Sequence, residues 1–472
     1  MQPSIFNKQV SLTGRDELFL MNMFTDSQLV VSPDVTQLLD RLDANPELAG
    51  ALSATEQSAL DDLREHGFVV ESRDAEWRAV DRFFRDVRED PSELRVTVLT
   101  TLQCNFACDY CFQGDHGDYN ATAEKMSAQT ANRLCDWIEL RLDELGSKQF
   151  GLTFFGGEPL LNLPVMYAMA ERLWRATQKR GVDMRINVIT NGLLLTPEVV
   201  DRLEPFGLHS IKITLDGDRA AHDHMRPLRG GQGTFDRIIA NIRQVAHRCN
   251  IAIGGNFVED TVDSYPALLD FLKAQDFADK LVKVSFKPVI REQPATATAT
   301  PGLIPLTPVG LDGSTLGGTC MTSAGSGAGS VCDSCNLLES KMSELREETK
   351  KRGFETLDGV HMGPCDIHRR HSNTVGPDGS IYACPGFTGE RTSAIGHISE
   401  ALEESHRRSA ADFESLAAWK SCGDCAFIPV CAGGCSVASQ SEQGDKHKPT
   451  CHKDSMEAAL VTFAHEAAAQ LM

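Results

Sequence analysis

The sequence predicts an α/β protein built around an open, partial (β/α)6 barrel of the TIM-like type. From about residue 94, apolar strand-like segments alternate with amphipathic helical segments, as expected for parallel strands joined by crossover helices. Six such units are too few to close an eight-stranded barrel. Polar and glycine-rich motifs follow these strands, at the end of the sheet where α/β folds place active sites. The six segments read LRVTVLT, FGLTFFGGEP, RINVITNG, SIKITLDG, IAIGGNFV and KVSFKPVI.

Length and charge limit the possible functions. A chain of 472 residues is long enough for two to four domains. A formal net charge of −20 argues against a general nucleic-acid binder, which needs a basic surface to neutralise phosphates. The sequence contains no run of about 18 apolar residues that could cross a membrane. Its first residues have no apolar signal core, so we expect a cytoplasmic protein that acts on neither nucleic acid nor membrane.

The segment before the barrel, residues 1–90, is expected to form a domain that resembles a winged-helix unit. ELFLMNMF and SQLVVS read as two strands around a tight turn. Two helices are expected after Ser32 and Ser53, the second with a capping box, and FVVES reads as a closing strand. Residues 75–90 then read as a helical linker.

The rest of the chain divides into three parts. The barrel is assigned to residues 91–292. Residues 293–360 are interpreted as a linker and bridging region, because they begin with a stretch rich in Ala, Thr, Pro, Gly and Ser and continue with the charged helix LLESKMSELREETKKRG. Residues 361–472 form a cysteine-rich domain.

Fifteen cysteines, an odd number, point to metal ligands or reactive thiols rather than to disulfides if the compartment is reducing. Cys135 and Cys249 stand alone in helix-like segments and are interpreted as core residues. The other cysteines gather in four neighbourhoods, residues 104–111, 320–335, 365–384 and 422–451. Such clustering is typical of metal sites.

The first neighbourhood, TLQCNFACDYCFQG, places Cys104, Cys108 and Cys111 directly after the first barrel strand. Iron–sulfur clusters are held by cysteine thiolates, normally four for a [4Fe–4S] cluster. Three thiolates would leave one iron open to a small molecule, as the open position of a catalytic metal does. The alternative is a zinc loop with a distant fourth ligand.

This C-x3-C-x2-C loop, with Tyr110 before its last cysteine, resembles that of the radical S-adenosylmethionine (SAM) family. The resemblance implies that the open iron binds the amino and carboxylate groups of SAM. Reductive cleavage of the cofactor then releases a 5′-deoxyadenosyl radical that abstracts hydrogen from the substrate. The segment after the second strand, GGEP, corresponds to the family segment that contacts the amino group of SAM, which implicates Gly156, Gly157 and Glu158.

Three further cofactor-binding residues are suggested by the same resemblance. Asn191 and Asp216 end the third and fourth strands, from which family members contact the ribose and the substrate. Turn chemistry is an equally good explanation of both residues. AHDHMRPLRGGQGTF resembles the segment after the fourth strand in peptide-modifying members, which makes Arg226 a candidate for the SAM carboxylate. No catalytic acid or base is identified.

The C-terminal cysteine spacing closely resembles that of the SPASM domain, which binds two auxiliary [4Fe–4S] clusters, for three clusters in all. A zinc ribbon fits the spacing poorly. The resemblance does not assign the fourth ligand of the first auxiliary cluster. The candidates are Cys320, Cys332, Cys335 or a substrate group. His361, His368 and His371 are expected on the surface. The resemblance assigns the first cluster to Cys365, Cys384 and Cys435, and the second to Cys422, Cys425, Cys431 and Cys451.

These resemblances imply a maturase of a ribosomally made precursor peptide. Its N-terminal domain would bind the leader by strand addition, and an electron donor such as flavodoxin or ferredoxin would supply electrons. The reaction expected is a cross-link, either a thioether or a carbon–carbon bond as in a cyclophane. Alternatives are peptide epimerisation and a sulfatase-type maturase forming formylglycine, although Cys384 is followed by Pro385 instead of the expected Asp.

Two alternatives lie outside catalysis: a non-catalytic iron–sulfur electron carrier and a zinc-binding interaction protein. The intact three-cysteine loop and GGEP segment argue against the first. The N-terminal domain could equally serve dimerisation or stability.

Overall fold

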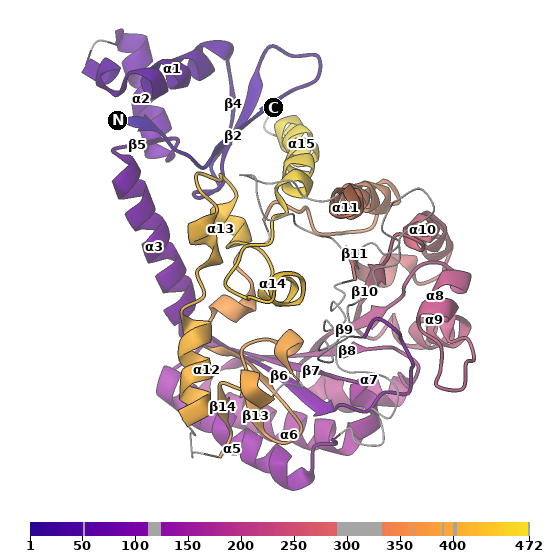
Figure 1. Ribbon diagram of the computed structural model, residues 1–472. Helices are drawn as coiled ribbons and strands as arrows, with labels where there is room; N and C mark the ends of the chain where they lie inside the picture. The colour runs from indigo at the N-terminus through magenta and orange to yellow at the C-terminus, as the bar shows by residue number, and fades with distance from the viewer. Residues whose placement is uncertain are drawn as a thin grey trace, which may run out of the picture.

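The computed structural model describes residues 1–50, 52–111, 124–289, 333–361, 363–388, 391–399 and 404–470. All six predicted barrel strands are present, and each pairs in parallel with its neighbour in chain order, so the expected partial barrel is confirmed. Figure 1 shows them as the curved central sheet. The strands are β6 (Glu93–Thr101), β7 (Gln149–Gly156), β8 (Asp183–Thr190), β9 (Leu208–Thr214), β10 (Asn250–Phe257) and β11 (Leu281–Pro288).

Helices cover the outer face of this sheet, and the two faces of the strands differ in polarity. Within β9, Ile211 and Ile213 are fully buried in the main core, whereas Lys212 and Thr214 point to the opposite, inner face. The same alternation runs along β11, where Val284 is in the core and Lys283 is not. The outer helices are α5 (Ala128–Leu145), α6 (Leu163–Arg180), α7 (Pro197–Leu203), α8 (Arg219–Met225), α9 (Phe235–Val245) and α10 (Tyr265–Lys273).

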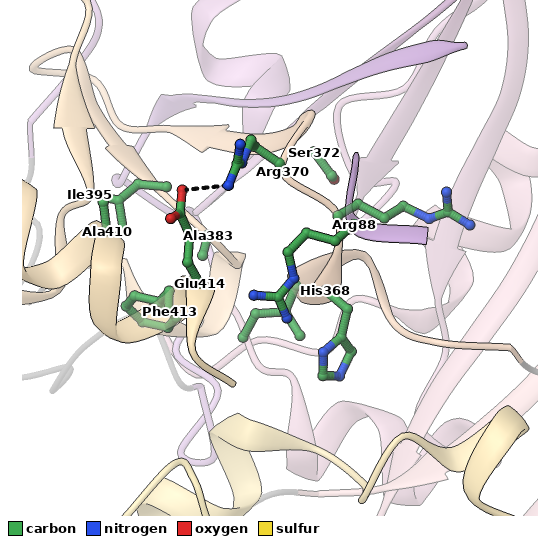
Figure 2. A pocket seen from close by; sticks show the side chains of 11 residues that line it. Arg88, His368, Arg370, Ser372, Ala383, Ile395, Ala410, Phe413 and Glu414 are labelled. Atoms are coloured by element: carbon green, nitrogen blue, oxygen red, sulfur yellow. Dashed lines mark ion pairs between the residues drawn. The ribbon is translucent and has the colours of Figure 1, made fainter. Parts of the chain in front are cut away.

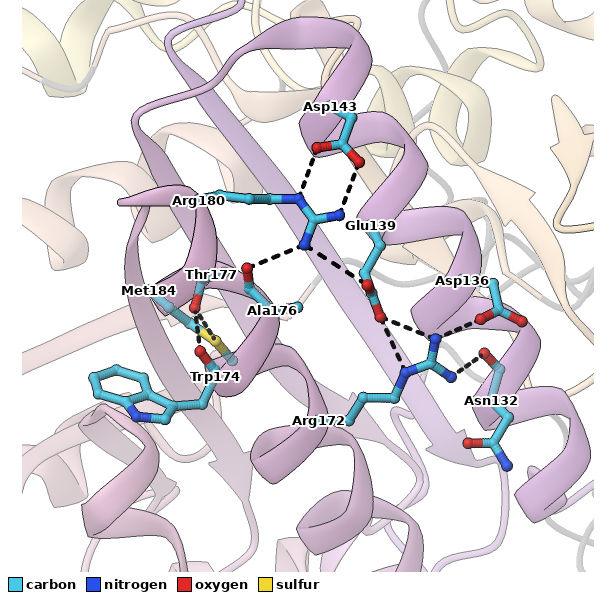
Figure 3. A network of polar contacts seen from close by, with 10 residues as sticks. All are labelled: Asn132, Asp136, Glu139, Asp143, Arg172, Trp174, Ala176, Thr177, Arg180 and Met184. Carbon is cyan, nitrogen blue, oxygen red and sulfur yellow. Dashed lines mark hydrogen bonds and ion pairs between the residues drawn. The ribbon is translucent and has the colours of Figure 1, made fainter.

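Helices α5 and α6 are joined by a network of ion pairs on their outer surface (Figure 3). Arg180 binds both carboxylate oxygens of Asp143, at 2.7 and 2.8 Å. Arg172 donates from Nε to Glu139 at 3.0 Å and also contacts Asp136. Bidentate arginine–carboxylate pairs fix the relative position of two groups better than single contacts do, so this network holds α5 and α6 in register.

The central sheet continues beyond the barrel into the C-terminal region. β12 (Ser372–Val375) pairs in parallel with β6, and β13 (Ser380–Tyr382) and β14 (Gly396–His397) extend it to nine strands. The sequence analysis did not predict this extension. Strands of two to four residues are too short to show a periodic pattern, and they join the cysteine-rich region directly to the barrel.

The N-terminal unit contains the expected hairpin and helices. β3 (Leu18–Asn22) and β4 (Gln28–Val31) flank a turn in which Asp26 has φ of 59°, and β2 (Asn7–Ser11) pairs with the other edge of β3. The capping box of Ser53 is confirmed at the start of α2 (Ala54–Glu65). Ser32 precedes α1 (Pro33–Ala44), but its side chain forms no cap. The closing strand, β5 (Val69–Val70), pairs with β1 (Gln2–Pro3) in a separate small sheet.

The predicted linker is a long helix, α3 (Arg73–Glu89), which runs beside the C-terminal region (Figure 1). Trp419 stacks on Phe84, with ring centroids 4.8 Å apart, and on Trp77 at 6.3 Å. From the N-terminal strands, Phe6 contacts Trp77 at 6.2 Å. The N-terminal sheet, α3 and the C-terminal helices α13 (Ile428–Cys431) and α15 (Lys453–Gln470) therefore bury one common core, here called the shared core.

Other predictions from single segments have mixed outcomes. Cys135 is buried in the core as expected, and Cys249 is only half-buried. The charged helix is present as α11 (Asp333–Lys351), and the remaining helices are α12 (Glu404–Glu414) and α14 (Ser436–Gln443). None of the helices in the described residues has the length and apolar character needed to cross a membrane.

Candidate active site

The three-cysteine loop begins where β6 ends, at the C-terminal edge of the barrel, and is held by a second segment from beyond α8. Phe106 is buried and forms a bridge with Leu228. The Ala107 N–H donates to the Pro227 carbonyl at 2.9 Å. Cys108 is buried, whereas Cys104 and Cys111 are half-buried. The backbone of the loop is thus fixed, and its three thiols lie at the mouth of the barrel.

Two glycines allow the segment after β7 to lie directly against the start of this loop. The Gly157 N–H donates to the Thr101 carbonyl at 2.9 Å, and the Glu158 N–H donates to the Gln103 carbonyl at 2.8 Å. A Cβ atom on Gly156 or Gly157 would lie 2.2 Å from one of these two carbonyl oxygens. Gly156 also has φ of 130°, which side chains other than glycine rarely adopt. Both glycines are therefore required by backbone packing.

Glu158 is fully buried, and its carboxylate is used inside the protein. It accepts hydrogen bonds from the Thr190 hydroxyl at 2.7 Å, from the Asn191 N–H at 2.8 Å and from the Leu160 N–H at 3.0 Å. Burial raises the pKa of Glu158, and these hydrogen bonds counteract the rise. The carboxylate joins the ends of β7 and β8, so Glu158 acts as a positioning residue for the segment around it.

Asn191 connects the end of β8 to the cysteine loop. Its Nδ2 donates to Asn105 Oδ1 at 2.7 Å and lies 4.0 Å from the sulfur of Cys104. Its Oδ1 accepts from the Leu193 N–H at 3.0 Å, which is an Asx turn. Asn191 therefore both forms a turn after β8 and contacts the cysteine loop.

Tyr110, Asp216 and Arg226 form one buried cluster. The Tyr110 hydroxyl donates to Asp216, and Arg226 donates to Tyr110 and lies 3.4 Å from Asp216. Burial alone would lower the pKa of Arg226, but Tyr110, Cys108 and Asp216 outweigh it, and the pKa is raised. Nε of Arg226 is buried and has no hydrogen-bond partner among the described residues. One donor therefore remains available on the side chain that the sequence assigned to the cofactor carboxylate.

Two residues of this cluster were missed by the sequence analysis. The Asn256 N–H donates to Asp216 Oδ1 at 2.7 Å, whereas Tyr110 donates to the other carboxylate oxygen. His222 is fully buried, and its Nδ1 accepts from the Asp216 N–H at 3.1 Å. Burial, and then the charge of Arg226, lower the pKa of His222 to about 3, which keeps the ring neutral. Only strand pairing and folding of α8 bring these residues together, so no local motif marks them.

Replacing Arg226 with glutamine is expected to destabilise the fold strongly, because it leaves the buried Asp216 without its cation. Breaking a buried charge pair by removing one partner costs about 3–5 kcal/mol. The melting temperature of the variant, followed by circular dichroism, measures this loss. Arg219→Gln is the matched control, since Arg219 pairs with Asp236 at the exposed surface and such pairs contribute little. Equal melting temperatures for the two variants would contradict the expectation.

The C-terminal cysteines fall into two spatial groups. The pKa of Cys384 is raised to about 12, by burial first and then by Cys365 and Cys435. The pKa of Cys431 is also raised to about 12, by burial first and then by Cys422, Cys425 and Cys451. The structure thus brings together the two ligand sets that the sequence suggested. Cys320 and Cys332 lie outside the described residues, as does the side chain of Cys335.

In the described ranges, no group of three or more His, Cys, Asp or Glu side chains has an arrangement that could hold a metal ion. A cubane cluster binds each thiolate to a different iron, so its ligands need not converge on one point as zinc ligands do. In each cysteine group, one thiol lies close enough to the others for them to raise its pKa: Cys108, Cys384 and Cys431, each after the larger effect of burial.

Three histidines of the C-terminal region were expected on the surface, and this expectation is wrong for two of them. His361 is exposed and pairs with Asp26 and Asp358, whereas His368 and His371 are buried. His368, three residues after Cys365 in the chain, lines a pocket with Arg88, Arg370 and Phe413 (Figure 2). Its buried Nε2 has no hydrogen-bond partner among the described residues, and burial, followed by Arg88, lowers its pKa to about 4.

Comparisons with known proteins agree with this geometry. Residues 98–264 match the model of the Radical SAM superfamily. The chain is 28% identical over 214 residues to Fe-coproporphyrin III synthase of Methanosarcina barkeri, covering 41% of this chain and 47% of that protein. It is 27% identical over 171 residues to the mycofactocin maturase MftC of Mycobacterium tuberculosis, covering 36% of this chain and 38% of that protein. The chain therefore spans less than half the length of these curated relatives.

Among solved structures, native anSMEcpe with bound AdoMet and Kp18Cys peptide superposes with a TM-score of 0.58 at 14% identity. The match covers 80% of this chain and 100% of that chain, and at this identity it shows a shared fold. The family match implies a [4Fe–4S] cluster and SAM as cofactors. The parallel barrel, the three-cysteine loop at its mouth and the match over residues 98–264 identify a radical SAM domain within this chain.

Proposed function

We propose that the chain is a peptide maturase, which abstracts hydrogen from a ribosomally made precursor peptide and installs a cross-link. The observation that carries the proposal is that three parts of the chain, the barrel, the C-terminal cysteine region and the N-terminal unit, pack against one another. A radical SAM barrel is flanked by two C-terminal cysteine groups, and an N-terminal sheet shares a core with one of those groups. The proposed domains are residues 1–90, 91–292, 293–360 and 361–472.

The residues at the barrel mouth fit the cofactors that the family requires. Cys104, Cys108 and Cys111 supply three thiolate ligands, which is one fewer than a [4Fe–4S] cluster can take. The free donor of Arg226 and the closely packed backbone at Gly156 and Gly157 suit the carboxylate and amino groups of SAM. When bound, the cluster and SAM supply a 5′-deoxyadenosyl radical for hydrogen abstraction.

The protein's own residues position this chemistry rather than take part in bond making. Glu158 fixes the segment after β7 through three hydrogen bonds, and Asn191 holds the cysteine loop through Asn105. Tyr110 and Asp216 orient Arg226 through their contacts with its guanidinium group. Rigid support of this kind matters because misplacing reacting groups by about 1 Å can cost about 100-fold in rate.

A peptide substrate is supported by the N-terminal unit and by the comparisons. Among the described strands, β4 pairs only with β3, so its other edge offers backbone N–H and C=O groups to an added leader strand. A tethered leader raises the effective concentration of the core peptide at the barrel. MftC is named as a maturase, and anSMEcpe, which shares the fold, was solved with a peptide bound. We further propose that the two C-terminal cysteine groups hold auxiliary [4Fe–4S] clusters and that an electron donor such as flavodoxin or ferredoxin supplies electrons.

The test is a mass measurement on peptides co-expressed anaerobically with the enzyme, one short reading frame beside its gene at a time. A cross-link removes two hydrogen atoms, so the modified peptide should be two hydrogens lighter. Fragmentation then locates the bond. The matched control is the same co-expression with Cys104, Cys108 and Cys111 all replaced by alanine, which should return unmodified peptide.

The other outcomes separate the alternatives. A peptide whose mass is unchanged in ordinary water, but which gains one deuterium when the reaction is run in deuterated water, would indicate epimerisation and overturn cross-linking. Formation of an aldehyde at a cysteine or serine would indicate a formylglycine-forming maturase. Unchanged peptides throughout, while SAM is still cleaved, would refute a ribosomal peptide encoded beside the gene as the substrate.

A further inference from the structure

Three lysines gather on the inner face of the barrel, near the strands that end beside the cysteine loop. Lys212 lies on β9, and Lys283 and Lys287 lie on β11. Lys212 and Lys283 are both in register with Ala252 on the strand between them. All three alternate with core residues of their own strands, so they point away from the helices and into the barrel.

A glycine in β10, the strand between the lysines, gives the side chain of Lys212 space to extend across that strand. A Cβ atom on Gly254 would lie 2.4 Å from Cε and 3.2 Å from Nζ of Lys212. Lys212 therefore extends over Gly254 toward β11, where Ser285 is in register with Gly254. Lys283 and Lys287 stand two residues to either side of Ser285 on the same face. Lys212 thus lies close enough to Lys283 and to the exposed Lys287 for both charges to act on it.

None of these ammonium groups forms an ion pair or a hydrogen bond within the described part of the chain. The pKa of Lys212 is lowered, first by burial and then by Lys287 and Lys283, with no carboxylate acting against them. This is unusual in a chain with a net charge of −20, in which most arginines of the barrel have a carboxylate partner. Like charges held together without a counter-ion are destabilising, so the arrangement suits a ligand that brings the negative charge.

The lysines lie close to the proposed reaction site. Lys287 is in register with Asn256, whose Nδ2 lies 3.4 Å from the Tyr110 hydroxyl and 3.4 Å from Asp216. Neighbouring strands are about 4.8 Å apart. A group bound by Lys287 would therefore lie one strand away from the residues that support the cysteine loop.

We infer that Lys212, Lys283 and Lys287 bind the carboxylate side chains of an acidic segment of the substrate peptide and position it in the barrel. The inference rests on the proposed function, because it takes the substrate to be a peptide. Carboxylates suit these residues because ammonium groups donate up to three charge-assisted hydrogen bonds each. The missing side chain at Gly254 gives Lys212 the space in which it extends toward β11.

A binding measurement tests this without requiring catalysis. Two fluorescein-labelled dodecapeptides, one alternating Glu with Gly and the other alternating Gln with Gly, are titrated into the anaerobically reconstituted full chain. Fluorescence anisotropy should show binding of the glutamate peptide at least about tenfold tighter than the glutamine peptide, since charged hydrogen bonds are lost in the latter. Higher salt should weaken the binding of the glutamate peptide only.

Variants assign the effect to the lysines. Lys212→Met and Lys287→Gln should each weaken binding of the glutamate peptide about tenfold. Lys351→Gln is the control, because Lys351 lies on α11 and already pairs with Glu348 at 2.9 Å. Without peptide, Lys212→Met should melt at the same or a higher temperature, because it removes like-charge repulsion, whereas loss of a structural lysine would lower the melting temperature.

Some results would overturn the inference. Equal binding of the two peptides would do so, as would unchanged affinity in both lysine variants. Displacement of a probe by inorganic triphosphate without discrimination between the peptides would assign the lysines to phosphate instead. Failure of the proposed function would give a different result. Binding of the glutamate peptide would still depend on the lysines, but the mass measurement would find only unmodified peptides. That result would support an acidic ligand and reject only the maturase reaction.

Discussion

Replacing Cys108 with alanine is expected to abolish reductive cleavage of SAM by the anaerobically reconstituted protein. Cys108 is the buried member of the three-cysteine loop, and its thiol lies near those of Cys111 and Cys104. The loop backbone is fixed by Pro227 and Leu228, so it cannot rearrange easily to present another ligand. Even indirect changes around a metal site reduce affinity or activity about 10–100-fold, so loss of a ligand should reduce 5′-deoxyadenosine by at least about 100-fold.

The assay is 5′-deoxyadenosine formed per enzyme with dithionite as reductant, measured beside iron and sulfide content. Cys249→Ala is the matched control, because Cys249 is a half-buried thiol outside all three cysteine groups and should leave both quantities unchanged. Cleavage by the Cys108→Ala protein at the rate of the parent protein would place the reactive cluster elsewhere in the chain.

Gly157→Ala should have the second largest effect. The added Cβ would lie 2.2 Å from the Gln103 carbonyl oxygen, so the strand end and the start of the cysteine loop must move apart. Overpacking of this kind typically costs about 1–3 kcal/mol in stability. A displacement of about 1 Å at the site should lower the rate of SAM cleavage by about 100-fold, more than the loss of stability would suggest.

Gly151→Ala, on the same strand, is the matched control. Its Cβ would meet side-chain atoms, Glu93 Oε1 at 3.4 Å and Arg95 Cγ at 3.7 Å, and a side chain can move where a backbone carbonyl cannot. We expect this variant to keep its cleavage rate within about twofold, since its contact lies within ordinary packing distance. Parallel melting curves separate the local displacement from general unfolding. If Gly157→Ala and Gly151→Ala cleave SAM equally fast, close backbone packing is not needed for cofactor binding.

The barrel could be predicted from the sequence because its signals are local. Each strand carries its own apolar alternation, and GGEP follows directly on the second strand. The capping box at Ser53 is likewise encoded within four residues. Loop cysteines in fixed spacings are recognisable for the same reason, and the two C-terminal sets meet in space as their spacing suggested.

Features that depend on long-range pairing could not be predicted. His222 reaches Asp216 only through the folding of α8, and Asn256 reaches it only because β10 pairs with β9. The partners of Glu158 come from β8, so the sequence identified the residue but not its role as a support. The lysines of β9 and β11 become neighbours only across an intervening strand, and sequence periodicity does not reveal which strands are adjacent.

The shared core has a consequence for protein engineering. Phe6, Val10 and Phe19 from the N-terminal sheet pack in one cluster with Trp419 and Ile428, which flank the cysteines of the second C-terminal group. A chimera that exchanges residues 1–90 for the equivalent segment of another enzyme would leave this apolar surface without its complement. An exchange of residues 1–90 therefore also requires matching substitutions on α13 and α15, whereas changes confined to the outer edge of β4 would leave the shared core intact.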